Sequence, residues 1–292
     1  MLRSYVEQNK RKFQTLLSFI FGASLTAFYL YHKRDVAEDS YFKGLSGKIL
    51  EQRKVYNEDS LIVDAMHMTH ALLQPRNIIF ANSSQMAKVS YDGSLTGDLI
   101  SASGACGSYA NVLCRLLQTL NFRARIGQMK VRNEFGGHII TEVLIGKEWV
   151  VLDASYDLCF INSKGQLASF SGIRDHWADY MKVLPPGYNP DYRYEDIRYA
   201  NWTKIPVIMP ALKRSLAFFS PKTNVNEISI RPYFIRKYQI YSIIAGSITV
   251  VTLILLLRGY ALVFLLRFMR PAKSRAISGA SYGELNTLQP GS

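Results

Sequence analysis

The stretch that decides the fold runs from residue 104 to residue 157 and reads GACGSYANVLCRLLQTLNFRARIGQMKVRNEFGGHIITEVLIGKEWVVLDASYD. Apolar residues recur in it at helical spacing over residues 107–120. Three segments of β character follow, at 124–131, 138–145 and 148–152. Gly136-Gly137 and Gly146-Lys147 separate these segments and are typical of turns. The sequence therefore predicts one helix packed on an antiparallel sheet, an α+β arrangement.

The segments on either side of this stretch carry weaker signals. Residues 57–73 have the apolar periodicity of a helix, which Pro75 is expected to close. Residues 74–104 are dense in Ser, Asn and Gly and predict a loop. Residues 163–226 form a tract rich in Tyr and Pro without clear periodicity. We expect the core of the folded domain to lie within residues 57–162.

Two uncharged apolar runs lie near the ends of the 292-residue chain. The first covers residues 13–31, and the second covers residues 240–257 or continues to Leu266. Each approaches the roughly 20 residues that a helix needs to cross a bilayer. A buried core helix usually carries charges on one edge, and these runs carry none. The first run also exceeds the usual apolar length of a signal peptide and lacks a small-residue cleavage site, which favours an uncleaved signal anchor.

The distribution of charge indicates an orientation for these runs. More than half of the formal net charge of +13 lies in residues 1–31 and 240–292, which argues against a nucleic-acid-binding face and for basic flanks of membrane segments. By the positive-inside rule both termini are cytoplasmic. The predicted organisation is a two-pass membrane protein with these parts: a basic cytoplasmic segment 1–12, a signal anchor 13–31, an exocytoplasmic domain 32–239, a transmembrane helix 240–257 and a basic cytoplasmic tail 258–292.

Three residues in the central stretch have the chemistry of a nucleophilic site. Cys106 lies between Gly-Ala and Gly-Ser immediately before the helical pattern, where free backbone N–H groups and the helix dipole favour a thiolate. His138 begins one predicted strand, and Asp153 ends the next. Antiparallel pairing through the turn at Gly146 brings these two ends together. The spacing predicts a base held by a carboxylate, close to a cysteine.

Each of these residues also has a purely structural alternative. An isolated Cys106 would more often be a small buried apolar residue. Asp157 could replace Asp153 as the partner of His138. His67 and His70 lie three apart on a predicted helix, but no third or fourth ligand for a metal accompanies them. Cys114 and Cys159 are expected in the core. The aromatic residues Tyr188, Tyr192, Tyr194, Tyr199 and Trp202 are expected to pack against the domain, with a substrate cleft or the membrane interface as the alternative locations.

Several motifs in this stretch resemble the transglutaminase-like superfamily. They comprise Gly104-Ala105-Cys106-Gly107, Asn121-Phe122-Arg123-Ala124-Arg125, His138, Glu142-Val143, Gly146, Trp149 and Asp153-Ala154-Ser155. The chain departs from the family pattern at Asn121, where Gly is usual, and at Ala154, where Pro is usual. The resemblance implies a papain-like fold with Cys106 as nucleophile, His138 as general base and acid, and Asp153 as the residue that orients His138.

The activity that this resemblance implies is acyl transfer or hydrolysis at an amide bond, without a cofactor or a metal. Hydrolysis is favoured over crosslinking, because transfer to an amine needs a water-excluding tunnel that the sequence does not specify. The predicted partners are the lipid bilayer and a peptide or other amide-containing substrate. The alternative is a non-catalytic envelope protein that keeps the fold for binding or as a scaffold. One oxyanion donor would be the backbone N–H of Cys106, and Gln85 is a candidate for the second by residue type alone.

Overall fold

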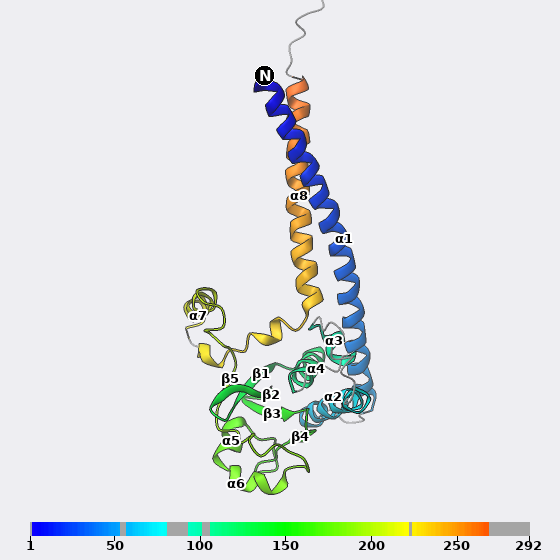
Figure 1. Ribbon diagram of the computed structural model, residues 1–292. Helices are drawn as coiled ribbons and strands as arrows, with labels where there is room; N and C mark the ends of the chain where they lie inside the picture. Colours follow the sequence, from blue (N-terminus) through cyan, green and yellow to red (C-terminus); the bar gives the residue numbers. More distant parts are fainter. Residues whose placement is uncertain (1, 53–56, 81–92, 101–105, 222–223, 269–292) are drawn as a thin grey trace, which may run out of the picture. The chain divides into compact units, whose positions relative to one another are not determined.

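The computed structural model describes residues 2–52, 57–80, 93–100, 106–221 and 224–268. The chain divides into two compact units. One comprises Tyr29–Ile243 and contains the whole sheet. The described part of the other consists of the helical residues 2–28 and 244–268. Figure 1 traces the helices and strands along the chain.

The Tyr29–Ile243 unit is built around a five-stranded antiparallel sheet with the order β4-β3-β2-β1-β5. Its strands are β1 (Ala124–Val131), β2 (Glu134–Ile145), β3 (Glu148–Asp153), β4 (Leu158–Cys159) and β5 (Ile197–Arg198). The turn predicted at Gly146-Lys147 is confirmed, since it joins β2 to β3. The predicted mixture of helix and antiparallel sheet is likewise confirmed.

The turn predicted at Gly136-Gly137 is wrong. Instead β1 and β2 are joined by Arg132-Asn133, both in the left-handed conformation with φ of 49° and 67°. The two glycines form a bulge inside β2, because Met129 pairs with His138 whereas Lys130 pairs with Phe135. A Cβ on Gly137 would lie 2.6 Å from Cβ of Val131, and Gly136 has φ of 103°. Glycine is therefore required here for a bulge that lies directly before His138.

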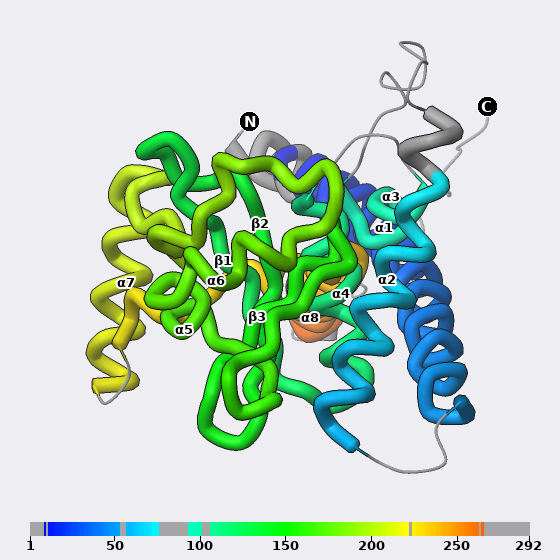
Figure 2. Tube along the Cα trace, turned by 90° about the horizontal axis from the view of Figure 1, so that it is seen from below, coloured from blue at the N-terminus to red at the C-terminus, as the bar shows by residue number. Residues whose placement is uncertain are grey.

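Helices α4 (Cys106–Thr119) and α2 (Glu58–Phe80) cover one face of the sheet, as the view from below shows (Figure 2). The predicted helix at residues 57–73 is confirmed in its start but not in its end, because α2 continues through Pro75 to Phe80. A proline inside a helix removes one backbone hydrogen bond, and its ring crowds the carbonyl group of the preceding turn. Helix α2 nevertheless continues past Pro75. The loop predicted at residues 74–104 is also partly wrong, since α3 spans Leu95–Ile100.

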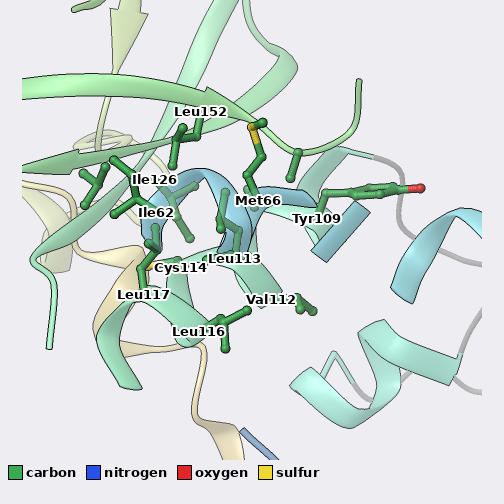
Figure 3. Packing of buried hydrophobic residues seen from close by; sticks show 14 of the residues in the cluster. Ile62, Met66, Tyr109, Val112, Leu113, Cys114, Leu116, Leu117, Ile126 and Leu152 are labelled. Carbon is green, nitrogen blue, oxygen red and sulfur yellow. The ribbon is translucent and has the colours of Figure 1, made fainter. Parts of the chain in front are cut away.

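The main core lies between α4, α2 and this face of the sheet (Figure 3). Helix α4 is enclosed on most of its sides, since every residue from Val112 to Leu117 is buried. The labelled members of this cluster are Ile62, Met66, Tyr109, Val112, Leu113, Cys114, Leu116, Leu117, Ile126 and Leu152. Each fully buried aliphatic side chain contributes on the order of 2 kcal/mol. Replacing Leu113 by Ala would cost about 2–5 kcal/mol, because it would also leave a cavity.

The opposite face of the sheet is covered by the Tyr- and Pro-rich tract. On this face the tract contains α5 (Phe170–Asp175), α6 (Trp177–Tyr180) and the 3-10 helix η2 (Met181–Val183). Further along the chain, α7 (Ile208–Phe219) and the 3-10 helices η3 (Val225–Glu227) and η4 (Arg231–Tyr233) instead line a cavity together with Phe122 and Trp149. Tyr194 is fully buried in this second core, against Phe160 and Phe170. Aromatic packing rather than periodicity organises the tract, which is why the sequence pattern did not predict its elements.

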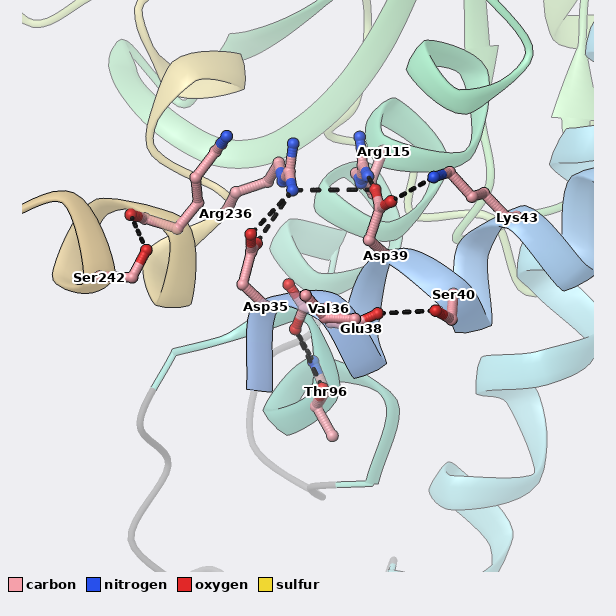
Figure 4. A network of polar contacts seen from close by, with 11 residues as sticks. Asp35, Val36, Glu38, Asp39, Ser40, Lys43, Thr96, Arg115, Arg236 and Ser242 are labelled. Atoms are coloured by element: carbon pink, nitrogen blue, oxygen red, sulfur yellow. Dashed lines mark hydrogen bonds and ion pairs between the residues drawn. The ribbon is translucent and has the colours of Figure 1, made fainter. Parts of the chain in front are cut away.

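A polar network joins α1 (Leu2–Glu51), α3, α4 and Arg236, which directly precedes α8 (Lys237–Phe268), within this unit (Figure 4). The guanidinium of Arg115 on α4 pairs with Asp39 on α1, and Arg236 donates to Asp35 at 2.9 Å. Glu38 accepts hydrogen bonds from the backbone N–H and the hydroxyl of Thr96, both at 3.0 Å. Through these contacts α1 holds α3 and α4 in place.

The other unit pairs the start of α1 (Leu2–Glu51) with the end of α8 (Lys237–Phe268). The hydroxyl of Thr249 donates to Ser24 at 2.9 Å, and Gly246 allows the ring of Phe28 to approach closely. Contacts of this kind between small and hydroxyl-bearing residues are typical of helix pairs in membranes. Most large apolar side chains of these segments are exposed, Phe19 by 73%. Both helices are long and apolar enough to cross a membrane.

Candidate active site

Cys106 is the first residue of α4 and is half-buried. The prediction placed it just before the helix, so the thiol lies at the helix N-terminus as expected. There the unpaired N–H groups and the positive end of the dipole face it. Cys106 carries a free thiol, as do Cys114 and Cys159.

Asp98 of α3 holds the first turns of α4. Its fully buried carboxylate accepts hydrogen bonds from the hydroxyl of Ser108 at 2.7 Å and from the side-chain amide of Asn111 at 3.0 Å. Helix α3 is itself capped by Ser94, whose hydroxyl accepts the N–H of Gly97 at 2.9 Å. Asp98 was not among the predicted site residues, because a single aspartate in a polar segment carries no signal of its partners.

His138 and Asp153 lie together on neighbouring strands. His138 Nε2 is 2.6 Å from Oδ2 of Asp153, and each residue is only 1% exposed. The other carboxylate oxygen accepts hydrogen bonds from the hydroxyl and the backbone N–H of Ser155, at 2.5 and 3.2 Å. The register pairs Thr141 with Leu152, so His138 and Asp153 form a diagonal pair on one face of the sheet. Asp153 is thereby fixed in an orientation that receives the imidazole.

The surroundings of His138 favour its charged form. Burial by itself lowers the pKa of this imidazole, but the charge and hydrogen bond of Asp153 more than reverse the effect. The nearby Cys106 thiol adds to the rise, and the pKa reaches about 9. Nδ1 is buried, and no described group lies in hydrogen-bond geometry to it. The nitrogen opposite Asp153 is therefore available to the thiol.

A cation outside the predicted set also acts on Cys106. Burial lowers the pKa of Arg231 in η4, while the nearby Cys106 acts in the opposite direction and Arg198 adds to the lowering. The two side chains are therefore close enough to interact electrostatically. Arg231 lies 125 residues after the cysteine in the sequence, so no local pattern links the two.

An aromatic cluster surrounds the imidazole. Tyr192 stacks on His138 with 4.1 Å between the ring centroids and 10° between the planes, and Tyr156 approaches edge-on at 5.9 Å. The hydroxyl of Tyr188 donates to the backbone carbonyl of Tyr192 at 3.2 Å. Of the alternatives open for the tyrosines, packing around the candidate site therefore holds for Tyr188 and Tyr192. The rings of Tyr192 and Tyr156 cover the imidazole of His138, which is only 1% exposed.

Other residues of the family motif support the sheet rather than the chemistry. Arg125 donates to the buried carboxylate of Glu142 at 2.7 Å, and its guanidinium lies between the rings of Trp149 and Tyr199, at 4.2 and 3.9 Å from their centroids. Burial raises the pKa of Glu142, and the charge of Arg125 limits that rise. The ion pair joins β1 to β2, and the contact of Arg125 with Trp149 extends the link to β3. Arg125, Glu142 and Trp149 therefore act together in stabilising the sheet.

The departure from the family pattern at Asn121 leaves the local backbone intact. Asn121 has φ of 67°, a left-handed conformation that glycine adopts freely and that asparagine tolerates better than most residues. The N–H of Phe122 donates to the carbonyl of Leu117 at 2.9 Å, as in a Schellman cap. At the second departure the carbonyl of Ala154 lies 2.8 Å from Nδ1 of His70. Both positions are accommodated without a change at the candidate site.

The other residues considered for the site, Asp157, Cys114 and Cys159, lie apart from the contact between His138 and Asp153. Asp157 does not reach His138, because its carboxylate pairs with Nδ1 of the exposed His67 at 2.7 Å. Cys114 is fully buried and its thiol has a pKa raised to about 12, whereas Cys159 is half-buried. No group of three or more His, Cys, Asp or Glu side chains able to hold a metal ion occurs in the described ranges. Gln85, Gly104 and Ala105 lie outside the described residues.

A comparison with family models supports the resemblance. The model of the transglutaminase-like superfamily matches residues 70–154, a segment that begins in α2 and ends one residue after Asp153. This segment is therefore similar to the transglutaminase-like superfamily, in agreement with its motifs. Such a domain indicates cysteine-dependent acyl transfer or hydrolysis. The comparisons with curated proteins and with solved structures found no match.

Proposed function

We propose that this protein is a membrane-anchored cysteine enzyme that hydrolyses or transfers an acyl group at an amide bond, with Cys106, His138 and Asp153 as its catalytic triad. The observation that carries the proposal is the 2.6 Å contact between two fully buried side chains, His138 and Asp153, beside a thiol at a helix N-terminus. A binding module would have no need of all three groups in this arrangement.

In the proposed mechanism the Cys106 thiolate attacks the carbonyl carbon of the substrate while His138 is protonated. The backbone N–H of Cys106 donates to the oxyanion. His138 gives its proton to the leaving amine as the C–N bond breaks, which leaves a thioester on Cys106. His138 then takes a proton from water, and the resulting attack releases the acid and the free thiol. Asp153 keeps the imidazole oriented throughout.

The two long apolar helices support membrane anchoring. In this proposal, residues 13–31 and 240–257 cross the bilayer, the domain of residues 32–239 lies outside the cytoplasm, and both termini are cytoplasmic. The exposed apolar side chains of the paired helices support the proposal, because soluble proteins rarely expose so large an apolar surface. Protease added to sealed cells is expected to cleave the central domain and to leave reporters at both termini intact. Protection of the central domain would reverse the proposed orientation.

Acylation by a generic ester tests the catalytic proposal without knowledge of the substrate. The full chain in detergent is mixed with p-nitrophenyl acetate, and nitrophenol release and the mass of the protein are followed. We expect a burst of nitrophenol and an acetyl group on Cys106. Cys106→Ser should remove both signals, and His138→Ala should slow both acylation and deacylation.

Cys159→Ser is the matched control, since it removes another half-buried free thiol. It should leave the burst unchanged. A burst that persists in Cys106→Ser would refute the assignment of the nucleophile. A wild-type chain that forms no acyl-enzyme, although iodoacetamide reaches Cys106, would favour the non-catalytic binding protein.

A further inference from the structure

Helix α7 and the segment after η4 expose an unusual number of large apolar side chains. On and beside α7, Val207 is 80% exposed and Phe218 and Phe219 are each 79% exposed. Tyr233 and Phe234 are exposed by 76% and 56%. Single exposed apolar residues are common on soluble proteins, but a group of aromatic residues this exposed marks a site of interaction. We call the four aromatic residues of this group, Phe218, Phe219, Tyr233 and Phe234, the aromatic patch.

Only some of the apolar residues of α7 pack against the rest of the domain. Leu212 and Leu216, one turn apart, line a cavity of about 840 Å³ together with Phe122, Trp149 and Tyr233. Phe218 and Phe219 do not line this cavity, and within α7 only Met209 is buried. The helix thus has one side that packs toward the domain and another that leaves aromatic rings in solvent.

The charges on α7 itself are positive. The helix contains Lys213 and Arg214 and no acidic residue, whereas Glu227, the next acidic residue in the sequence, lines the cavity with Leu212 and Leu216. Exposed aromatic rings interspersed with cations are typical of segments that lie in the interface of an anionic bilayer.

The position of the aromatic patch in the chain favours the same partner. Phe234 precedes the first residue of α8, Lys237, by three residues, and α8 is one of the two helices able to cross a membrane. Residues of α7 and of η4 line the same cavity, and η4 is followed closely by α8. Helix α7 therefore also lies near the start of α8. A bilayer crossed by α8 is therefore within reach of the patch.

We infer that the aromatic patch inserts into the lipid headgroup region and seats the transglutaminase-like domain on the membrane surface. This inference rests on the membrane anchoring proposed above. The ligand is an anionic lipid surface: the rings of Phe218 and Phe219 enter the interface, and Lys213 and Arg214 contact headgroup phosphates. Seating would restrict the candidate active site to substrates presented close to the membrane.

Tryptophan fluorescence in vesicles tests this inference. Full-length Phe218→Trp and Phe219→Trp are reconstituted into vesicles of dibrominated phosphatidylcholine and phosphatidylglycerol, and the emission of the wild-type chain is subtracted. We expect the added emission to be shifted to shorter wavelength and quenched by the brominated chains. Val183→Trp is the matched control, because Val183 is 67% exposed but belongs to η2. Its emission should remain that of an indole in water, without quenching.

The outcomes separate the aromatic patch from the anchors. Suppose that the emission is unquenched at both positions while the chain resists carbonate extraction. This result would refute the insertion of the aromatic patch into the membrane and leave the membrane anchoring intact. Extraction of the wild-type chain by carbonate would instead refute the anchoring. Unquenched emission that shifts to shorter wavelength only as the protein-to-lipid ratio rises would also overturn the inference, since it would place a second copy of the chain on the patch. A Lys213→Glu, Arg214→Glu double variant should lose much of the quenching.

Discussion

Replacing Asp153 by Asn tests whether the carboxylate keeps His138 charged. Burial lowers the pKa of His138, yet the contact with Asp153 at 2.6 Å helps to raise it from 6.5 to about 9. The difference between these values corresponds to about 3 kcal/mol of interaction in favour of the imidazolium. Without the carboxylate, burial prevails, and we expect the pKa of His138 in Asp153→Asn to fall below 6.5.

The assay compares two alkylating reagents on Cys106 as a function of pH. An imidazolium attracts the anionic reagent iodoacetate, whereas iodoacetamide is neutral and follows the thiolate alone. In the wild-type chain the ratio of the two rates should fall around pH 9, where His138 loses its proton. In Asp153→Asn the fall should move below pH 6.5. A ratio that falls at the same pH in both chains would refute the ion-pair assignment.

The same pair predicts a dependence of stability on pH. Because the pKa of His138 is raised on folding, its contribution to the free energy of unfolding is complete below pH 6.5 and is lost as the pH rises through about 9. Thermal unfolding in detergent should show this decline between pH 6.5 and 9 for the wild-type chain. The Asp153→Asn chain should lack it.

Three further variants test the surroundings of the candidate site and the helix pair. Asp98→Ala leaves two donors of α4 without their acceptor and should lower the free energy of unfolding by on the order of 2–4 kcal/mol, measured by thermal unfolding, with partial recovery in Asp98→Asn. Gly246→Leu should weaken the pairing of α1 with α8 by about 1–3 kcal/mol, since a Cβ there lies 3.1 Å from an aromatic ring; Gly22→Leu, whose Cβ meets nothing within 4 Å, should not. Asp157→Asn breaks a half-exposed pair with His67 and should cost under about 1 kcal/mol without slowing ester cleavage; a large loss of rate would make it the partner of the catalytic base.

The sequence alone predicted the elements whose signals are local. β1 covers Ala124–Val131, the limits that its residue types indicated, and α4 departs from its predicted range by one residue at each end. The order of Cys106, His138 and Asp153 placed a histidine and an aspartate at adjoining strand ends, and the structure brings the two together. Helical periodicity, strand propensity and hairpin pairing act over a few residues, so a single sequence carries them.

Other features required the tertiary structure. The Gly136-Gly137 pair is equally suited to a turn and to a bulge, and only the pairing of β1 with β2 decided for the bulge. Helix α3 has six residues and depends on Glu38, 58 residues before Thr96 in the sequence. It is too short to be stable by itself, and a distant side chain supplies the acceptor for the N–H of Thr96 in its first turn.

The residues that surround the candidate site were also identified only by the tertiary structure. Tyr192 stacks on His138 from a tract without periodicity, and Arg231 reaches the electrostatic surroundings of Cys106 from beyond α7. Residue type placed Tyr192 in an aromatic cluster without linking it to His138, and it did not connect Arg231 with Cys106. The sequence determined which side chains can carry the chemistry, because that depends on residue type and local backbone. The tertiary structure decided which groups bury, orient and charge them, because burial and electrostatic interaction depend on distance in space rather than along the chain.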